Sequence, residues 1–291
     1  MLSDPNSSAI SERAFLVGCP RSGTTLLQSM LMAHPEIHSF PETKFFIRSF
    51  GGRWRWMLHE TLRGGYLWYL IVRWLVENGY LTRGDVYNIP LSWSKTEMVE
   101  VFRGVLDCLA AEQEAEVWIE KTPRHLHCMD AIQRHMPAAQ FIHIVRDGRA
   151  VVASMYKLAY THPDTWGHYQ SIDRIIQRWN RCIKDTLRYA DDDRHTVVRY
   201  ERLVETPRQV LQEFSSTLNV KYNSDMIEDF HHQAARVVKP HEAWKKGTTT
   251  SSSLENRGLD KFHSVLSIKQ QEYVSDHLNW SEYQNLERLL V

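Results

Sequence analysis

The sequence predicts an α/β protein of the P-loop type, with a parallel sheet flanked by helices and a Trp-rich helical insertion. Apolar runs at 14–18, 117–119, 141–145 and 196–200 have the length of buried strands. Segments with helical spacing lie between these runs, and strands that alternate with helices favour a parallel sheet covered on both faces. The first run leads directly into a glycine-containing loop and then a helix, so the chain opens with a strand–loop–helix unit.

Start and stop signals place the helices. Apolar residues at helical spacing over 26–31 predict a helix that stops near His34-Pro35, because a residue before proline resists the α region. Pro207 suits the first turn of another helix, after the run at 196–200. Ser94-Lys-Thr-Glu97 and Ser267-Ile-Lys-Gln270 have the pattern of capping boxes. These signals agree with the alternation of strands and helices.

The length of 291 residues fits a single domain over 1–291, with an ordered core over 12–291. Segment 50–93 interrupts the alternation and carries five tryptophans and several tyrosines. We favour a helical insertion that packs on the sheet. The alternative is an aromatic wall or lid of an acceptor pocket.

Charge and cysteine content narrow the class of protein. Basic and acidic residues are equal at 35 each, which argues against a nucleic-acid partner. The four cysteines are scattered without a C-x-x-C pair, as expected for a reduced, cytoplasmic protein. The most apolar stretch, 66–76, contains Arg73 and is shorter than the ~18 residues of a membrane span. We therefore expect no transmembrane segment, and the N-terminus has no signal-peptide pattern.

The loop after the first strand has the spacing of an anion site. Gly18 and Gly23 match G-x-x-x-x-G-K-[ST], but Thr24 stands where the lysine belongs. Such a loop directs backbone N–H groups and the positive end of a helix at an anion. Arg21 supplies the fixed positive charge, in a planar fork that can grip a phosphate or sulfate at two points. The missing lysine disfavours chemistry on ATP–Mg²⁺.

The segment Pro20-Arg-Ser-Gly-Thr-Thr-Leu-Leu resembles the 5'-phosphosulfate-binding loop of sulfotransferases that use 3'-phosphoadenosine-5'-phosphosulfate (PAPS). Its arginine form is similar to protein-tyrosine sulfotransferases and their bacterial relatives. The resemblance implies transfer of a sulfuryl group from PAPS to a hydroxyl, with 3',5'-ADP as the other product. It also implies that the co-substrate's phosphosulfate binds to Arg21, Ser22, Gly23, Thr24 and Thr25.

Other segments extend the resemblance to the 3'-phosphate. Residues 141–155 resemble the strand–turn–helix that binds this group, which implies roles for Arg146 and Ser154. An arginine at a carboxyl strand end also points to the crevice where open α/β sheets bind ligands. Weaker matches imply Tyr200 near the nucleotide, and Arg257 with Gly258 in a late loop whose usual middle lysine is absent.

Sulfuryl transfer requires a base, cations on the transferring and leaving groups, and in-line positioning. Phe40-Pro-Glu-Thr-Lys-Phe-Phe resembles the segment that carries a glutamate base, so Glu42 is the candidate. Lys121 resembles the second catalytic cation after Arg21. His125 is an alternative base, by similarity to the cytosolic branch of the family. A serine within 251–253 is a candidate contact to the sulfuryl oxygens.

The fifteen histidines show no set of ligands at a recognisable spacing, so we expect no metal. The acceptor is a hydroxyl on a small molecule, carbohydrate, lipid or peptide. One alternative is a P-loop kinase or NTPase, which Thr24 disfavours. A second is a non-catalytic nucleotide-binding relative, which the combination of Arg21, Glu42 and Lys121 disfavours.

Overall fold

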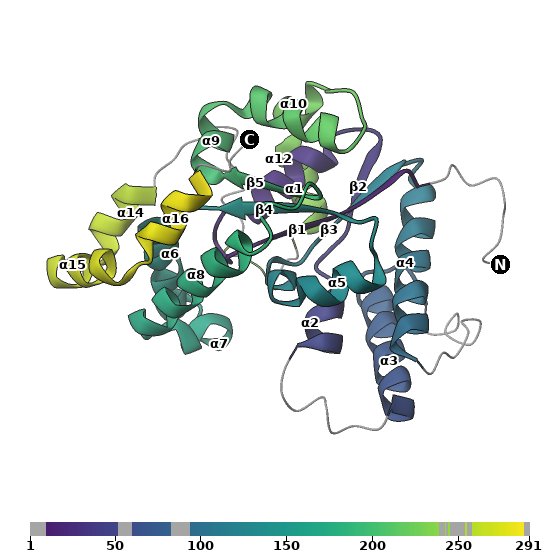
Figure 1. The fold of residues 1–291 in the computed structure, drawn as a ribbon, viewed down its shortest axis with the longest axis horizontal. Coiled ribbons are helices and arrows are strands. Elements are labelled where there is room, and N and C mark those ends of the chain that lie inside the picture. The colour runs from purple at the N-terminus through teal and green to yellow at the C-terminus, as the bar shows by residue number, and fades with distance from the viewer. Residues whose placement is uncertain are drawn as a thin grey trace.

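The computed structural model describes residues 10–51, 60–82, 94–238 and 258–287, together with residues 242, 244 and 254. Its centre is a five-stranded parallel sheet with the strand order β2-β3-β1-β4-β5 (Figure 1). Helices cover both faces of this sheet. The predicted α/β class with a parallel sheet is therefore confirmed.

The four predicted strands are present, and one short strand was not predicted. The edge strand β2 has only three residues, too few to stand out as a periodic pattern. The strands are β1 (Glu12–Gly18), β2 (Ile37–Ser39), β3 (Val117–Lys121), β4 (Gln140–Val145) and β5 (His195–Arg199). In the central strand β1, Ala14 and Leu16 face one side of the sheet while Phe15 and Val17 face the other. This alternation follows from the two-residue period of a strand and gives the protein two apolar layers.

The helices divide between these two layers. Helices α1, α10, α11 and α12 cover the face of Ala14 and Leu16, while α2 to α6 and α8 cover the face of Phe15 (Figure 1). The capping boxes at Ser94 and Ser267 are both confirmed. The bounds are α1 (Thr24–Met32), α2 (Phe45–Phe50), α3 (Glu60–Glu77), α4 (Lys95–Ala111), α5 (Met129–His135), α6 (Gly148–Thr161), α7 (Pro163–Trp166), α8 (Ile172–Leu187), α9 (Tyr200–Glu205), α10 (Pro207–Thr217), α11 (Asp225–Glu228), α12 (Phe230–Val237), α14 (Gly258–Val265), α15 (Ile268–His277) and α16 (Trp280–Glu287), with 3₁₀ turns η3 (Pro123–Cys128) and η4 (Gly167–Tyr169).

The described part of segment 50–93 consists mainly of helix α3. Helix α3 buries Trp74, whose ring centroid lies 6.3 Å from that of Phe40 in the core. Tyr66 and Tyr69 on the same helix are exposed. Four further aromatic residues of the segment, Trp54, Trp56, Tyr87 and Trp93, lie outside the described residues. Within the described ranges, no helix combines the length and apolarity needed to cross a bilayer.

Two histidines of the sheet give the protein an expected sensitivity to acid. His143 in β4 and His195 in β5 share a hydrogen bond of 2.9 Å between Nε2 and Nδ1. Burial lowers the pKa of His143 to about 3 and that of His195 to about 4. Both rings are therefore neutral in the folded protein, whereas a histidine in the unfolded chain takes up a proton near pH 6.5.

Stability is accordingly expected to fall as the pH falls from about 6.5 toward about 4, by up to about 1.4 kcal/mol per pH unit for each histidine. Urea unfolding at pH 7 and pH 5 measures this loss. The His143→Gln variant removes one of the two groups, so its free energy of unfolding should depend less steeply on pH. An equally steep pH dependence in this variant would assign the acid sensitivity to other groups.

Candidate functional site

Several sequence-predicted residues lie at or directly after strand ends that meet at one edge of the sheet. In the strand register, Lys121 lies beside Leu16, Gly18 lies beside Ile144, and Val145 lies beside Arg199. The carboxyl ends of β3, β1, β4 and β5 therefore stand next to one another. In a parallel α/β sheet this is the edge at which ligands bind.

Two glycines allow the loop between β1 and α1 to approach its neighbours closely. A Cβ on Gly18 would lie 2.4 Å from the carbonyl oxygen of Ile144, and one on Gly23 would lie 2.3 Å from the ring of Tyr200. Gly23 is the N-cap of α1, has a φ of 98° and brings no side chain to cap the helix. The first amides of a helix lack partners within the helix. The amides at the start of α1, including those of Thr24 and Thr25, are thus oriented to receive an anion.

Arg21 holds an uncommon backbone conformation in this loop, with a φ of 74° in the left-handed region. Such a conformation in a residue other than glycine costs about 1–3 kcal/mol and is enriched at functional sites. The Nε of Arg21 donates to Ser154 Oγ at 3.2 Å, which joins the loop to α6. Burial, and then the neighbouring Arg146, lower the pKa of Arg21 to about 10. Two guanidinium groups thus crowd together at this point.

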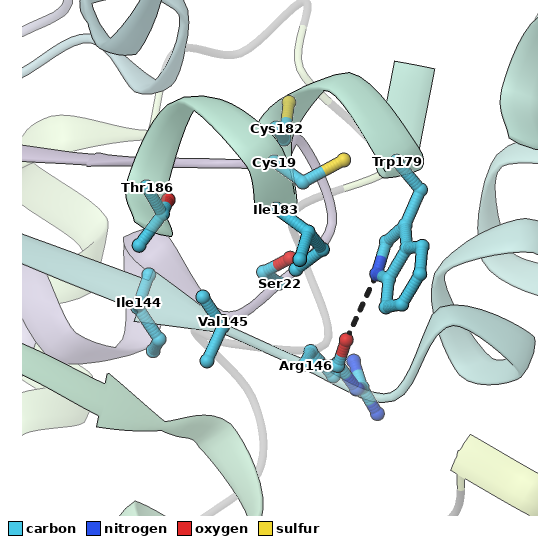
Figure 2. A pocket seen from close by; sticks show the side chains of 9 residues that line it. All are labelled: Cys19, Ser22, Ile144, Val145, Arg146, Trp179, Cys182, Ile183 and Thr186. Atoms are coloured by element: carbon cyan, nitrogen blue, oxygen red, sulfur yellow. Dashed lines mark hydrogen bonds between the residues drawn. The ribbon is translucent and has the colours of Figure 1, made fainter. Parts of the chain in front are cut away.

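Arg146 follows β4 and is held from two sides. Its Nη1 donates to the carbonyl of Arg21 at 3.3 Å, and its guanidinium lies 3.9 Å from the ring centroid of Tyr200. The carbonyl of Arg146 accepts from Trp179 Nε1 at 3.0 Å (Figure 2). Within the described residues, the buried Nε of Arg146 has no hydrogen-bond partner. An arginine donor that is buried and unsatisfied is a group that a bound anion would complete.

The structure adds a cation that the sequence analysis missed. Lys261 lies on α14, which packs against α6. Burial lowers the pKa of Lys261, and the charges of Arg21, Arg146 and Lys157 lower it further. The sequence could have indicated Lys157, because it lies three positions after Ser154 and therefore on the same face of α6. For Lys261, only the packing of α14 on α6 reveals its place.

Ser22 lies under the loop and not on its open side. Its hydroxyl is fully buried, and it lines a narrow pocket with Cys19 and Cys182 that has no room for a water molecule (Figure 2). Its N–H donates to the carbonyl of Cys19 at 3.1 Å and closes the turn of the loop. In this structure, the buried side chain of Ser22 therefore shapes the loop.

The predicted base and the second cation form an ion pair. Lys121 Nζ lies 2.7 Å from Glu42 Oε1. The side chain of Lys121 at the end of β3 is only 3% exposed, whereas that of Glu42, between β2 and α2, is 22% exposed. A buried ammonium that holds a partly exposed carboxylate leaves that carboxylate within reach of an incoming molecule. Lys121 thus ends the strand that lies directly beside β1, the strand that leads into the glycine loop.

His125 occupies a different place from that expected of an alternative base. Its side chain is fully buried, its Nε2 accepts from the backbone N–H of Phe46 at 3.1 Å, and its Nδ1 lies 2.9 Å from Glu120 Oε2. Nε2 is thus occupied by a backbone donor, and Nδ1 is buried facing Glu120, so neither ring nitrogen is open to an acceptor. This geometry favours Glu42 over His125 as the group that meets an acceptor.

The late loop is only partly placed. Gly258 begins α14 and is buried, whereas Arg257 and the serines of 251–253 lie outside the described residues. Among the described residues, no group of three or more histidine, cysteine, aspartate or glutamate side chains is arranged to hold a metal ion.

The comparisons with known proteins agree with this geometry. Residues 13–224 match the family model described as "Sulfotransferase family". The chain is 30% identical over 225 residues to a protein-tyrosine sulfotransferase of Drosophila melanogaster. That alignment covers 75% of this chain and 40% of the fly protein, so the chain spans less than two thirds of that relative's length.

Solved structures share the fold. The sulfotransferase domain from the Synechococcus olefin synthase superposes with a TM-score of 0.61 at 22% identity, over 94% of this chain and 96% of that domain. A mouse sulfotransferase complexed with PAP superposes with a TM-score of 0.53 at 10% identity, over 93% and 85%. The fold and the family match, which covers more than half of the sequence, lead to one conclusion: this chain belongs to the sulfotransferase family.

Proposed function

We propose that this protein transfers the sulfuryl group of PAPS to a hydroxyl of an acceptor. One observation carries the proposal: Arg21 and Arg146, joined by a hydrogen bond, lie beside the uncapped start of α1, at the sheet edge that also carries the ion pair of Glu42 and Lys121. The cations beside α1 suit a ligand with phosphate at both ends. The pair of Glu42 and Lys121 suits removal of a proton from the acceptor and stabilisation of the charge on the leaving group. Their adjacency at one sheet edge fits a single reaction.

In this proposal, the two ends of the nucleotide bind to different parts of the site. The amides of Gly23, Thr24 and Thr25 and the guanidinium of Arg21 hold the phosphosulfate end, because the loop directs donors and a helix N-terminus to one point. Arg146 and Ser154 hold the 3'-phosphate, and Lys261 adds a third cation. The cation–π contact of Arg146 with Tyr200 fixes the orientation of the guanidinium plane.

PAPS supplies the group that is transferred, and the chain supplies the base and the positive charge. Glu42 accepts the proton of the acceptor hydroxyl, which makes the oxygen a better nucleophile. Lys121 and Arg21 offset the negative charge that develops on the leaving phosphate. An ammonium has three donors, so Lys121 can keep its contact with Glu42 while it faces the leaving group. The same contact would keep the carboxylate of Glu42 oriented toward the acceptor hydroxyl.

The names of the relatives guide the choice of acceptor for assays. Several are protein-tyrosine sulfotransferases, so a tyrosine hydroxyl in a peptide is the first acceptor to test. Hydroxyls of carbohydrates, lipids and small molecules are the other acceptors to test. The kinase alternative shares the strand–loop–helix unit, but Thr24 stands in place of the lysine that such enzymes direct at the β- and γ-phosphates.

Thermal unfolding with nucleotides tests the proposal. We expect 3',5'-ADP without Mg²⁺ to stabilise the protein by ~2.7 kcal/mol at 100 times its Kd, and ATP with Mg²⁺ to have little effect. The Arg146→Gln variant should lose most of the shift caused by 3',5'-ADP. Labelled PAPS and a panel of acceptors then test turnover. A larger shift with ATP and Mg²⁺ than with 3',5'-ADP would instead support the kinase alternative.

A further inference from the structure

Glu120 is a fully buried carboxylate that the proposed reaction does not use. It lies in β3, immediately before Lys121, and has no exposed surface. Its Oε1 accepts from the N–H of Thr43 at 3.1 Å, from Thr43 Oγ1 at 2.8 Å and from Thr122 Oγ1 at 2.6 Å. Thr122 lies in the same segment as Glu120, whereas Thr43 lies 77 residues before Glu120 in the sequence.

His125 completes the surroundings of this carboxylate. Because its Nε2 accepts the N–H of Phe46, its proton is on Nδ1, which faces Glu120 Oε2 at 2.9 Å. Burial alone would disfavour the charged form of Glu120. The contacts with His125, Thr122 and Thr43 outweigh this effect and hold the pKa of Glu120 below its usual value. The group is therefore a buried anion, with hydrogen bonds from Thr43 and Thr122 to Oε1 and an ion-pair contact from His125 to Oε2.

The two threonines show what this anion holds together. Thr43 directly follows Glu42, and Thr122 directly follows Lys121, the two residues whose side chains meet at 2.7 Å. Thr122 Oγ1 also accepts from the N–H of Lys44 at 3.2 Å, which adds a second link between the same segments. One carboxylate thus joins the segment of the base to the segment of the cation.

We propose that Glu120 is a positioning residue, which fixes Glu42 against Lys121 by binding the threonine that follows each of them. This inference rests on the proposed function, because it assigns Glu42 and Lys121 to the reaction. A buried charge adds little net stability, because its desolvation offsets what its partners contribute, and its best-attested use is to select one arrangement of the chain. Here the arrangement selected is the geometry of base and cation.

The Glu120→Gln variant tests this role. Glutamine keeps an oxygen for the threonines, but its NH₂ meets the Nδ1–H of His125, so the link must rearrange. We expect kcat to fall by roughly 10²-fold, since a displacement of about 1 Å can cost that much. The Kd for 3',5'-ADP should stay unchanged, because Arg21 and Arg146 are untouched. Thr122→Val is a milder variant, isosteric with the native residue, in which kcat should fall less.

Asp107→Asn is the matched control for loss of stability. Asp107 accepts from Arg13 Nε and Nη2, both at 2.9 Å, and from Trp118 Nε1 at 2.7 Å. It therefore joins β1 and β3 through a similar number of hydrogen bonds, but near the opposite end of these strands. We expect this variant to lose stability while its kcat, measured below its unfolding temperature, stays near that of the wild type.

A crystal structure of the Glu120→Gln variant gives a readout that does not depend on turnover. The proposal predicts that the contact between Glu42 and Lys121 is lost or displaced. An intact contact together with a wild-type kcat, or an equal loss of kcat in Asp107→Asn, would overturn it. Failure of the proposed function has a different signature, because the wild-type protein would then neither bind 3',5'-ADP nor consume PAPS.

Discussion

Replacement of Glu42 by glutamine is expected to lower kcat by ~10²–10⁴-fold, the usual contribution of a positioned general base. Glutamine has nearly the same shape but cannot take a proton from the acceptor hydroxyl. The Kd for 3',5'-ADP should remain at the wild-type value, because the nucleotide contacts come from the phosphate loop and Arg146. Steady-state turnover of labelled PAPS and calorimetric titration with 3',5'-ADP measure the two quantities.

Glu36→Gln is the matched control for this experiment. Glu36 is a half-buried carboxylate directly before β2, at the end of the strand opposite to Glu42. Its replacement should leave both kcat and nucleotide affinity near the wild-type values. Near-normal turnover in Glu42→Gln would remove Glu42 from the mechanism.

Replacement of Lys121 by methionine is expected to lower kcat by ~10²–10³-fold, the cost of removing one well-directed electrostatic donor. Methionine fills a similar volume without a charge. The change removes the cation beside the leaving phosphate and also releases Glu42 from its contact at 2.7 Å. Turnover of labelled PAPS gives kcat, and a titration with 3',5'-ADP shows how far the ground-state affinity changes.

Lys44→Met separates this effect from a general loss of positive charge. Lys44 is exposed and lies two residues after Glu42. Its side chain is a surface group, so its replacement should leave turnover unchanged. Comparable losses of kcat in Lys44→Met and Lys121→Met would mean that Lys121 has no directed role.

Local signals made most of the fold predictable. The strands at 14–18 and 141–145 are apolar runs bounded by turns, and the boxes at Ser94 and Ser267 are four-residue patterns that specify a helix start. Such signals do not depend on the rest of the chain. Strand β2 was not predicted because three residues are too few to show a two-residue period, and because half-buried His38 interrupts the apolar pattern.

Motifs give candidates for the site, but they do not show which residues packing brings together. The resemblance proposes Glu42, Lys121, Arg146 and Ser154, and the strand register brings the ends of β3, β1 and β4 to one edge. Lys261 was missed because its proximity to Arg21 depends on the docking of α14. The role inferred for Glu120 was missed because its partners at Thr43 and His125 arise only from the folded turn. A glutamate directly before a lysine at the end of a strand does not by itself indicate a positioning role.

A crystal structure of the protein soaked with 3',5'-ADP would show where the nucleotide binds. We expect the 5'-phosphate to lie against the amides of Gly23 to Thr25 and Arg21, and the 3'-phosphate against Arg146 and Ser154. The open side of the 5'-phosphate should then face Glu42 and Lys121. A nucleotide bound elsewhere, or bound with its 5'-phosphate turned away from the ion pair, would rule out the proposed site.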